Sequence, residues 1–138
     1  MELAGHAIVT LHVAASEPDA ALHVFLSEEE SDGSVRYVTE GVLRVLHRKV
    51  TTCPRNYRAS WPYHSCNRGD AASLVAGRLE EVVIVLLPIA WRFNSGSRIR
   101  LAIAGADADH YGQVPHGRPP GLTIDRSNSC LDLPVRIL

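Results

Sequence analysis

The residues whose types and spacing could do chemistry stand out most clearly in Arg98–Tyr111, which reads RIRLAIAGADADHY. This segment begins as an alternating strand and ends in Asp107, Asp109 and His110. Two carboxylates of the same strand parity could form an acid/base pair or bind a metal ion, if burial raised a pKa or further ligands joined them. The small residues around Gly105 are instead typical of a chain leaving a sheet, where an aspartate bonds nearby backbone amides. We therefore interpret Asp107 and Asp109 as turn residues.

A metal site needs ligands at characteristic spacings, and the sequence offers only a loose set. Cys53, His64 and Cys66 come closest, but they lack the paired C-x-x-C spacing of a structural zinc site, and a fourth ligand is not obvious. His110 and His116 lie in a predicted loop. Three further histidines are predicted to lie on outward faces of strands: His6, His12 and His23. We predict no metal ion and no cofactor.

A nucleophilic triad could be drawn from His64, Ser65 and Asp70, or around Cys66. Adjacent residues of an extended chain point in opposite directions, so His64 is badly placed to act as the base for Ser65. The sequence also contains no Gly-x-Ser-x-Gly elbow, the turn that carries the nucleophile in α/β-hydrolases. We therefore predict no catalytic residue in this chain.

Three aromatic residues, Trp61, Tyr63 and Trp91, could form a platform for a sugar ring or a hydrophobic substrate. The alternative is that they fill the edge of the fold beneath a long loop, because aromatic side chains mostly serve burial. We take Trp61, Tyr63 and the neighbouring His64 as the candidate binding residues, for either a ligand or an interface.

Strands must position these side chains, because the dominant pattern in the sequence has a period of two. No amphipathic helix is evident, and turn signals such as Asp32-Gly33 separate the short alternating segments. This pattern predicts an all-β sandwich or barrel. The residues expected to face inward are Val9, Leu11, Val13, Leu22, Val24, Leu26, Ile99, Leu101, Ile103, Leu131, Leu133, Val135 and Ile137.

Three segments depart from simple alternation. Gly41 interrupts the strand after Ser34, where we expect a bulge or a close backbone approach. Residues 47–78 show no sustained period, which predicts a long irregular loop held down by its aromatic residues. Val82–Leu87 is apolar on both faces, so this strand is either central or turns its outer face to a partner. In the second case the isolated chain should dimerise or aggregate.

Composition narrows the class of protein. The 138 residues carry a formal net charge of -1, which gives no basic excess for nucleic acid. No apolar stretch reaches the roughly 18 residues of a membrane-spanning helix, and the first residues do not resemble a signal peptide. The three cysteines are an odd number, which fits a reducing compartment. We expect one cytoplasmic domain over residues 1–138, with no nucleic-acid or membrane partner.

Several runs together resemble a known family. The segments SVRYVTEGVLRVLHRK, PYHSCNRGDAASLVAG and LLPIAWRFNSGSRIRLAIAGADADHY are similar to the C-terminal, non-catalytic domain of X-Pro dipeptidyl-peptidases and cocaine esterases, the CocE/NonD serine hydrolases. The resemblance rests on Tyr37–Gly41, Pro62–Ser65, Gly96, Arg98–Leu101 and Gly105–Asp107, in the family's order and approximate spacing.

The resemblance implies a jelly-roll β-sandwich of the galactose-binding type that follows an α/β-hydrolase domain, packs on it and helps wall its substrate pocket. The catalytic domain would be in the same polypeptide or a separate chain. The sequence departs from the family at Val75–Arg78, where Val-Pro-Gly-Glu is usual, and at Gly96-Ser97, where Gly-His is usual. Our leading hypothesis is such an accessory module, with residues 47–78 as the contact element. The alternative is a free-standing carbohydrate-binding or protein-binding jelly roll.

Overall fold

The computed structural model describes residues 1–136 as a β-structure with two short 3-10 helices. The helices are η1 (Val45–His47) and η2 (Arg68–Asp70). The strands are β1 (Glu2–Gly5), β2 (Ile8–Ala15), β3 (Ala21–Glu29), β4 (Val35–Arg44), β5 (Glu80–Val85), β6 (Ile89–Arg92), β7 (Arg98–Ala104) and β8 (Leu122–Asp132). The predicted all-β class is confirmed.

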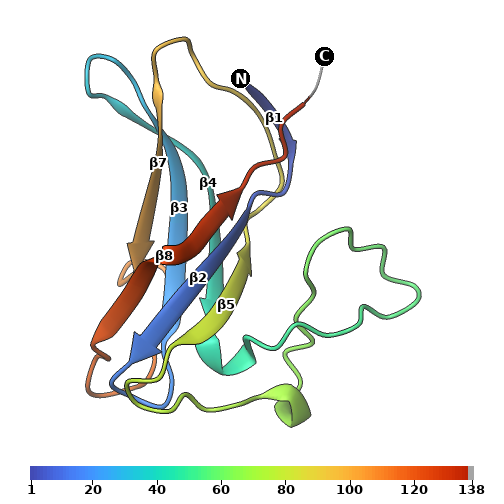
Figure 1. Ribbon diagram of the computed structural model, residues 1–138, viewed down its shortest axis with the longest axis vertical. Helices are drawn as coiled ribbons and strands as arrows, with labels where there is room; N and C mark the ends of the chain where they lie inside the picture. The colour runs from blue at the N-terminus through green and yellow to red at the C-terminus, as the bar shows by residue number, and fades with distance from the viewer. Residues whose placement is uncertain (137–138) are drawn as a thin grey trace.

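Two three-stranded antiparallel sheets form the sandwich. One has the order β5-β2-β8 and the other β4-β3-β7, while β1 and β6 pair separately. Figure 1 shows the two sheets as layers, with both ends of the described chain near β1 at one end of the molecule. A bridge between Leu3 and Val135 joins those ends.

The core lies between β2 and β3, the middle strands of the two sheets. Val9, Leu11 and Val13 of β2 are buried, as are Leu22, Val24 and Leu26 of β3, which confirms the predicted inward faces of both strands. Central strands lose most surface because neighbours on both edges and the opposite sheet all cover them.

Backbone contacts join the two sheets along the seam between β4 and β5. The amide of Leu87 donates to the carbonyl of Glu40 (2.8 Å), and the Thr39 hydroxyl donates to the carbonyl of Leu87 (2.9 Å). A Cβ on Gly41 would stand 2.7 Å from the carbonyl oxygen of Val85. The close approach expected at Gly41 is therefore present. The bulge is elsewhere, at Val38, where the pairing of β3 with β4 shifts register.

The opposite side of the sandwich is open. There β7 and β8 are the outermost strands of their sheets and are not paired with each other among the described residues. An apolar groove of about 320 Å³ lies between them, lined by Leu11, Ile99, Leu101, Ile103, Ile124, Arg126, Ser129, Cys130 and Leu131. The inward-facing Ile99 is consequently 40% exposed.

Two expectations need correction, and one pair of alternatives is narrowed. β5 is an edge strand, because β2 is its partner on one side only, so the central position, one of the two alternatives for Val82–Leu87, is excluded. Val135 is exposed, since it lies beyond the end of β8. His23 faces outward from its sheet but is buried, because Tyr111 covers it at a ring distance of 4.9 Å. The pairing of β8 with β2 is interrupted by a register shift between Thr10 and His12. Ile137 lies outside the described residues.

Residues 47–78 form the expected irregular loop, which projects beside β4 and β5 (Figure 1). Backbone hydrogen bonds hold it at intervals: Thr51 to Tyr63 (2.8 Å), Ala72 to Leu46 (3.0 Å) and Leu74 to Pro18 (2.8 Å). Among the described residues, no helix is long and apolar enough to span a bilayer.

Candidate functional site

The aspartates after β7 organise a turn, as the sequence predicts. Asp107 accepts a hydrogen bond from the amide of Asp109 (3.2 Å) and contacts Nδ1 of His110 (3.1 Å). Its own carbonyl accepts from the amide of Tyr111 (2.9 Å). Burial raises the pKa of Asp107, but the hydrogen bond and charge of His110, with the turn amides, outweigh it and leave that pKa below its usual value. A low pKa does not suit a general acid at neutral pH.

The residues of the hypothetical triad do not assemble into one. The Ser65 hydroxyl donates to Asp70 (2.7 Å), which also pairs with Lys49. The hydrogen bonds from Lys49 and then Ser65 lower the pKa of Asp70. His64 turns away from both, towards the carbonyls of Lys49 (3.1 Å) and Val83 (2.9 Å). Ser65 therefore has a carboxylate neighbour that is paired with Lys49, and His64 is not placed to act as its base.

The candidate metal ligands are also not gathered. No group of three or more His, Cys, Asp or Glu side chains is arranged to hold a metal ion in the part of the chain that the structure describes. Cys53 donates to the carbonyl of Tyr57 (3.1 Å), and Cys66 is exposed.

Trp61, Tyr63 and His64 do come together, in a hollow between the loop and the seam. This loop hollow has a volume of about 250 Å³. Trp61 stacks on His6 with ring centres 4.1 Å apart, and Tyr63 lies 5.7 Å from the ring of Tyr57. The lining residues are Val42, Leu43, Tyr57, Trp61, Pro62, Tyr63, His64, Cys66, Val83, Ile84 and Val85.

His64 attaches the loop to β5. Its two ring nitrogens contact two backbone carbonyls, those of Lys49 and Val83. A neutral imidazole can donate to only one of them, whereas a protonated ring donates to both. Since Val83 belongs to β5 and Lys49 to the start of the loop, one side chain fixes the position of the loop hollow.

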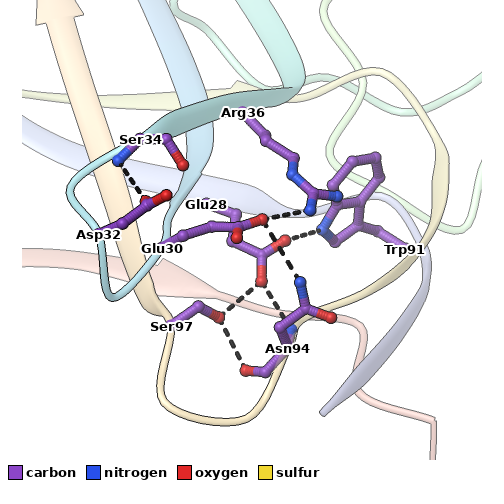
Figure 2. A network of polar contacts seen from close by, with 8 residues as sticks. All are labelled: Glu28, Glu30, Asp32, Ser34, Arg36, Trp91, Asn94 and Ser97. Carbon is purple, nitrogen blue, oxygen red and sulfur yellow. Dashed lines mark hydrogen bonds and ion pairs between the residues drawn. The ribbon is translucent and has the colours of Figure 1, made fainter.

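Trp91 is not part of this platform. Its Nε1 donates to the fully buried carboxylate of Glu28 (3.0 Å), together with the amide of Asn94 (2.6 Å) and the hydroxyl of Ser97 (2.6 Å). Figure 2 shows these three donors converging on one carboxylate at the β6–β7 turn. Hydrogen bonds from Ser97 and Asn94 outweigh burial and, with Trp91 and the charge of Arg36, hold the pKa of Glu28 below its ordinary value.

A second hollow adjoins the first along the seam. This His23 hollow has a volume of about 200 Å³ and is lined by His23, Phe25, Glu40, Gly41, Val42, Val85, Leu87, Asp107 and Tyr111. Both hollows are lined by Val42 and Val85. We call the two hollows together the seam surface. Exposed Val42, Tyr57, Leu87 and Tyr111 give it an apolar character.

Sequence reasoning named Trp61, Tyr63 and His64, which line the loop hollow, but it missed Glu28 and the His23 hollow. Glu28 lies in the run SEEESDGS, which reads as a polar hairpin connection. Nothing in that run distinguishes the one inward glutamate, because its donors come from β6 and the following turn. His23 follows the outward parity of β3, and the loop that covers it is distant in sequence.

Comparison with known proteins places this sandwich within a family. A model described as the X-Pro dipeptidyl-peptidase C-terminal non-catalytic domain matches residues 1–129. Two curated relatives, "Putative serine esterase Mb1866c" of Mycobacterium bovis and "Putative serine esterase MT1883" of Mycobacterium tuberculosis, are each 41% identical over 98% of this chain. The chain spans only 22% of their length.

Solved structures agree on the fold. A crystal structure of a CocE/NonD family hydrolase from Staphylococcus aureus superposes with a TM-score of 0.71 at 19% identity, covering 96% of this chain and 28% of that one. A second structure of that hydrolase gives a TM-score of 0.64, covering 93% and 24%. The sandwich, and the match to nearly all of its length, lead to one assignment: the chain belongs to the family of X-Pro dipeptidyl-peptidase C-terminal non-catalytic domains.

Proposed function

We propose that the chain is the accessory module of a serine hydrolase, packing on an α/β-hydrolase domain and helping to shape its substrate pocket. The observation that carries the proposal is the difference in length between this chain and its relatives. Nearly all of this chain (98%) aligns with the relatives, but the aligned part is only 22% of their length. The hydrolase domain would belong to the same polypeptide or to a separate chain. The parent reaction would be acyl transfer through a serine, on an ester, amide or X-Pro peptide bond.

The seam surface is the part of this chain best suited to the contact. It combines exposed apolar side chains with concave hollows, and contiguous exposed apolar surface marks interfaces. Leu87 is 59% exposed and stands where the two sheets join, so a partner there would contact both sheets and the loop. The occupant would be the hydrolase domain, because the relatives carry most of their length outside the matched segment.

A binding experiment tests the contact. The chain would be titrated by calorimetry against the part of the Mycobacterium tuberculosis relative that lies outside the matched segment. We expect Leu87→Lys to weaken binding by at least about tenfold, since burying a leucine contributes about 1.5–3 kcal/mol. Val135→Lys is the matched control, because Val135 is also exposed but lies at the β1 end. Equal effects of both variants, or no binding of the unmodified chain, would refute this contact.

An activity assay tests the absence of chemistry in the chain itself. The purified chain should hydrolyse a nitrophenyl ester no faster than buffer, because the Ser65 hydroxyl donates to a carboxylate that Lys49 already pairs, and His64 is directed elsewhere. Turnover that disappears on treatment with a serine-directed inhibitor would overturn this expectation.

A second candidate function is carbohydrate or protein binding by a free-standing module. It is favoured by the pairing of Trp61 and Tyr63 in one hollow. Because His6 already stacks on one face of Trp61, only the other face is available to a sugar ring. Glycan-array binding that Trp61→Ala abolishes would favour this function over the first.

A further inference from the structure

The His23 hollow, which is one part of the seam surface, also has the features of a small binding pocket. Its walls are apolar, formed by Phe25, Val42, Val85 and Leu87. Its volume of about 200 Å³ lies below the roughly 300–1,000 Å³ of pockets that take drug-sized ligands. The hollow therefore suits one functional group on a short apolar stem rather than a sugar ring or a peptide backbone.

His23 provides the buried polar group of this pocket. The residue is only 3% exposed and lines the hollow, and no hydrogen bond joins its ring to another described residue. Its nitrogens are not enclosed by protein, because the fully buried ring nitrogens without a partner among the described residues are Nδ1 of His12 and Nδ1 of His47. Its close neighbour is the ring of Tyr111, with centres 4.9 Å apart. A ring nitrogen that no protein group occupies at a cavity wall is available to a group bound in that cavity.

The charged side chains that line the hollow indicate whether it would bind a cation or an anion. Glu40 and Asp107 line it, and of the described residues at its walls none is Lys or Arg. Burial raises the pKa of Asp107, but the hydrogen bond and charge of the adjacent His110, together with the turn amides, lower it by more, so the pKa lies below its usual value. Asp107 is therefore ionised at neutral pH. The negative charge of Glu40 also acts on the nearby Tyr37 phenol: burial is the larger cause that raises the pKa of Tyr37, and the charge of Glu40 is the next. Two carboxylates in an apolar hollow favour a cation.

We propose that the His23 hollow binds an organic cation, an ammonium or guanidinium group on a short aliphatic stem. Glu40 and Asp107 accept its charged hydrogen bonds, and a ring nitrogen of His23 supplies a further acceptor. The Tyr111 ring offers its face to the charge, and Phe25 and Leu87 contact the stem. This chemistry could come from a free amine or from a lysine or arginine side chain of a partner.

The first experiment uses the isolated 138-residue chain and small probes. Propylammonium and propylguanidinium chlorides would be titrated at constant ionic strength while backbone amide shifts are followed by NMR. We expect saturable shifts at His23, Glu40, Gly41 and Tyr111, with Kd in the millimolar range that suits so few contacting atoms. Propanol and sodium butyrate are the neutral and anionic controls of similar size, and neither should saturate.

Two variants test the assigned carboxylates. Glu40→Gln should weaken binding of the cation at least about tenfold, the value of one charge-assisted hydrogen bond. Asp107→Asn should do the same, but Glu40→Gln is the primary variant because Asp107 also organises its turn. Glu81→Gln is the matched control, since Glu81 is an exposed carboxylate on β5 outside the hollow. Its Kd should equal that of the unmodified chain.

Three outcomes of these titrations would contradict cation binding in the His23 hollow. Absent shifts, equal shifts with propanol, or an unchanged Kd in Glu40→Gln would overturn the proposal. The source of the cation is settled by repeating the titration in a complex with a hydrolase domain. Binding that persists there identifies a free amine as ligand, and loss of binding with the same amides already shifted identifies a partner side chain. The probe titration stands even if no hydrolase domain binds the chain, so the two proposals fail separately.

Discussion

At the scale of single residues, the most constrained side chain is Glu28. Its carboxylate is fully buried, and it remains charged because Trp91, Asn94 and Ser97 all donate to it. Glu28 belongs to β3 while its donors belong to β6 and the β6–β7 turn. This one carboxylate therefore fixes the end of the β6–β7 connection against the central strand of a sheet, as Figure 2 shows.

Replacing Glu28 by glutamine should make stability less dependent on pH. The pKa of Glu28 is lowered in the folded chain, so its contribution is present above about its ordinary value of 4.5 and is lost as the pH falls through the lowered folded value. Glu28→Gln should be less stable than the unmodified chain at pH 7, and the difference should narrow in acid. Urea unfolding across this range measures it.

Glu29→Gln provides the control for this prediction. Glu29 is the next residue along β3, is only partly buried, and has Arg98 as a distant partner at 3.8 Å. The free energy of unfolding of the Glu29→Gln variant should equal that of the unmodified chain at every pH. A Glu28→Gln variant with a constant stability difference from pH 7 into acid would show that the carboxylate is not responsible.

Residue roles were predictable where neighbours in sequence decide them. The turn role of Asp107 follows from the small residues around it, and strand parity predicts that His64 and Ser65 point in different directions, as their separate hydrogen-bond partners show. Glu28 and His23 were not predictable, because the groups that bury them lie far along the chain. The assignment of Trp61, Tyr63 and His64 to binding stays a prediction.

At the scale of elements, the loop of residues 47–78 is irregular yet held at several points. Its backbone bonds to Leu46 and Pro18, and the His64 contact to β5, leave the tip between Pro54 and Ser60 as the least restrained part. Most residues of that tip, including Arg55 and Arg58, are exposed. The loop is therefore stabilised mainly at its base and by one histidine.

His64→Ala should loosen the loop without unfolding the sandwich. The substitution removes the contact to Val83, and one lost hydrogen bond of about 1 kcal/mol raises the open population roughly fivefold. Tryptic cleavage after Arg55 or Arg58 should accelerate by about that factor, followed by mass spectrometry, while the melting temperature changes little. His116→Ala, in the exposed β7–β8 loop, should cleave like the unmodified chain; an unchanged rate in His64→Ala would contradict the anchor.

Elements were predictable from period-two patterns, but their interruptions were predictable only as pairs of alternatives. The inward faces of β2 and β3 follow directly from alternation. At Gly41 the close backbone approach is present, whereas the bulge lies at Val38, because register depends on pairing with Leu26 and Ser27 of the partner strand. The apolar run in β5 left a central strand and a partner-facing strand open. β5 is an edge strand, and the loop provides part of its outer cover.

At the scale of the whole molecule, the sandwich is closed on one side only. Hydrogen bonds of Leu87 with Glu40 and Thr39 join the sheets at the β4–β5 seam, whereas β7 and β8 leave a groove of about 320 Å³. Unpaired edge strands with exposed apolar residues favour association with other chains. The sequence predicts self-association through the outer face of Val82–Leu87 if that face normally meets a partner, and the structure adds this groove as a second apolar surface.

Comparison of two variants separates these surfaces. If the groove drives association, Ile99→Lys should weaken self-association of the isolated chain by about tenfold or more, because it removes a large apolar side chain from a contact. Leu87→Lys should then have little effect. Sedimentation velocity over a concentration series measures both. A larger effect of Leu87→Lys would assign association to the seam surface, and a monomer at all concentrations would exclude both.

The open side also determines which backbone amides should exchange with solvent first. Amides of β2 and β3 lie between bonded neighbours on both edges, but the outer amides of β7 and β8 have solvent on one side. In deuterated water, exchange should therefore spread from the margin at β7 and β8 towards the seam at Gly41. The molecule loses order from the side where its two layers are not joined.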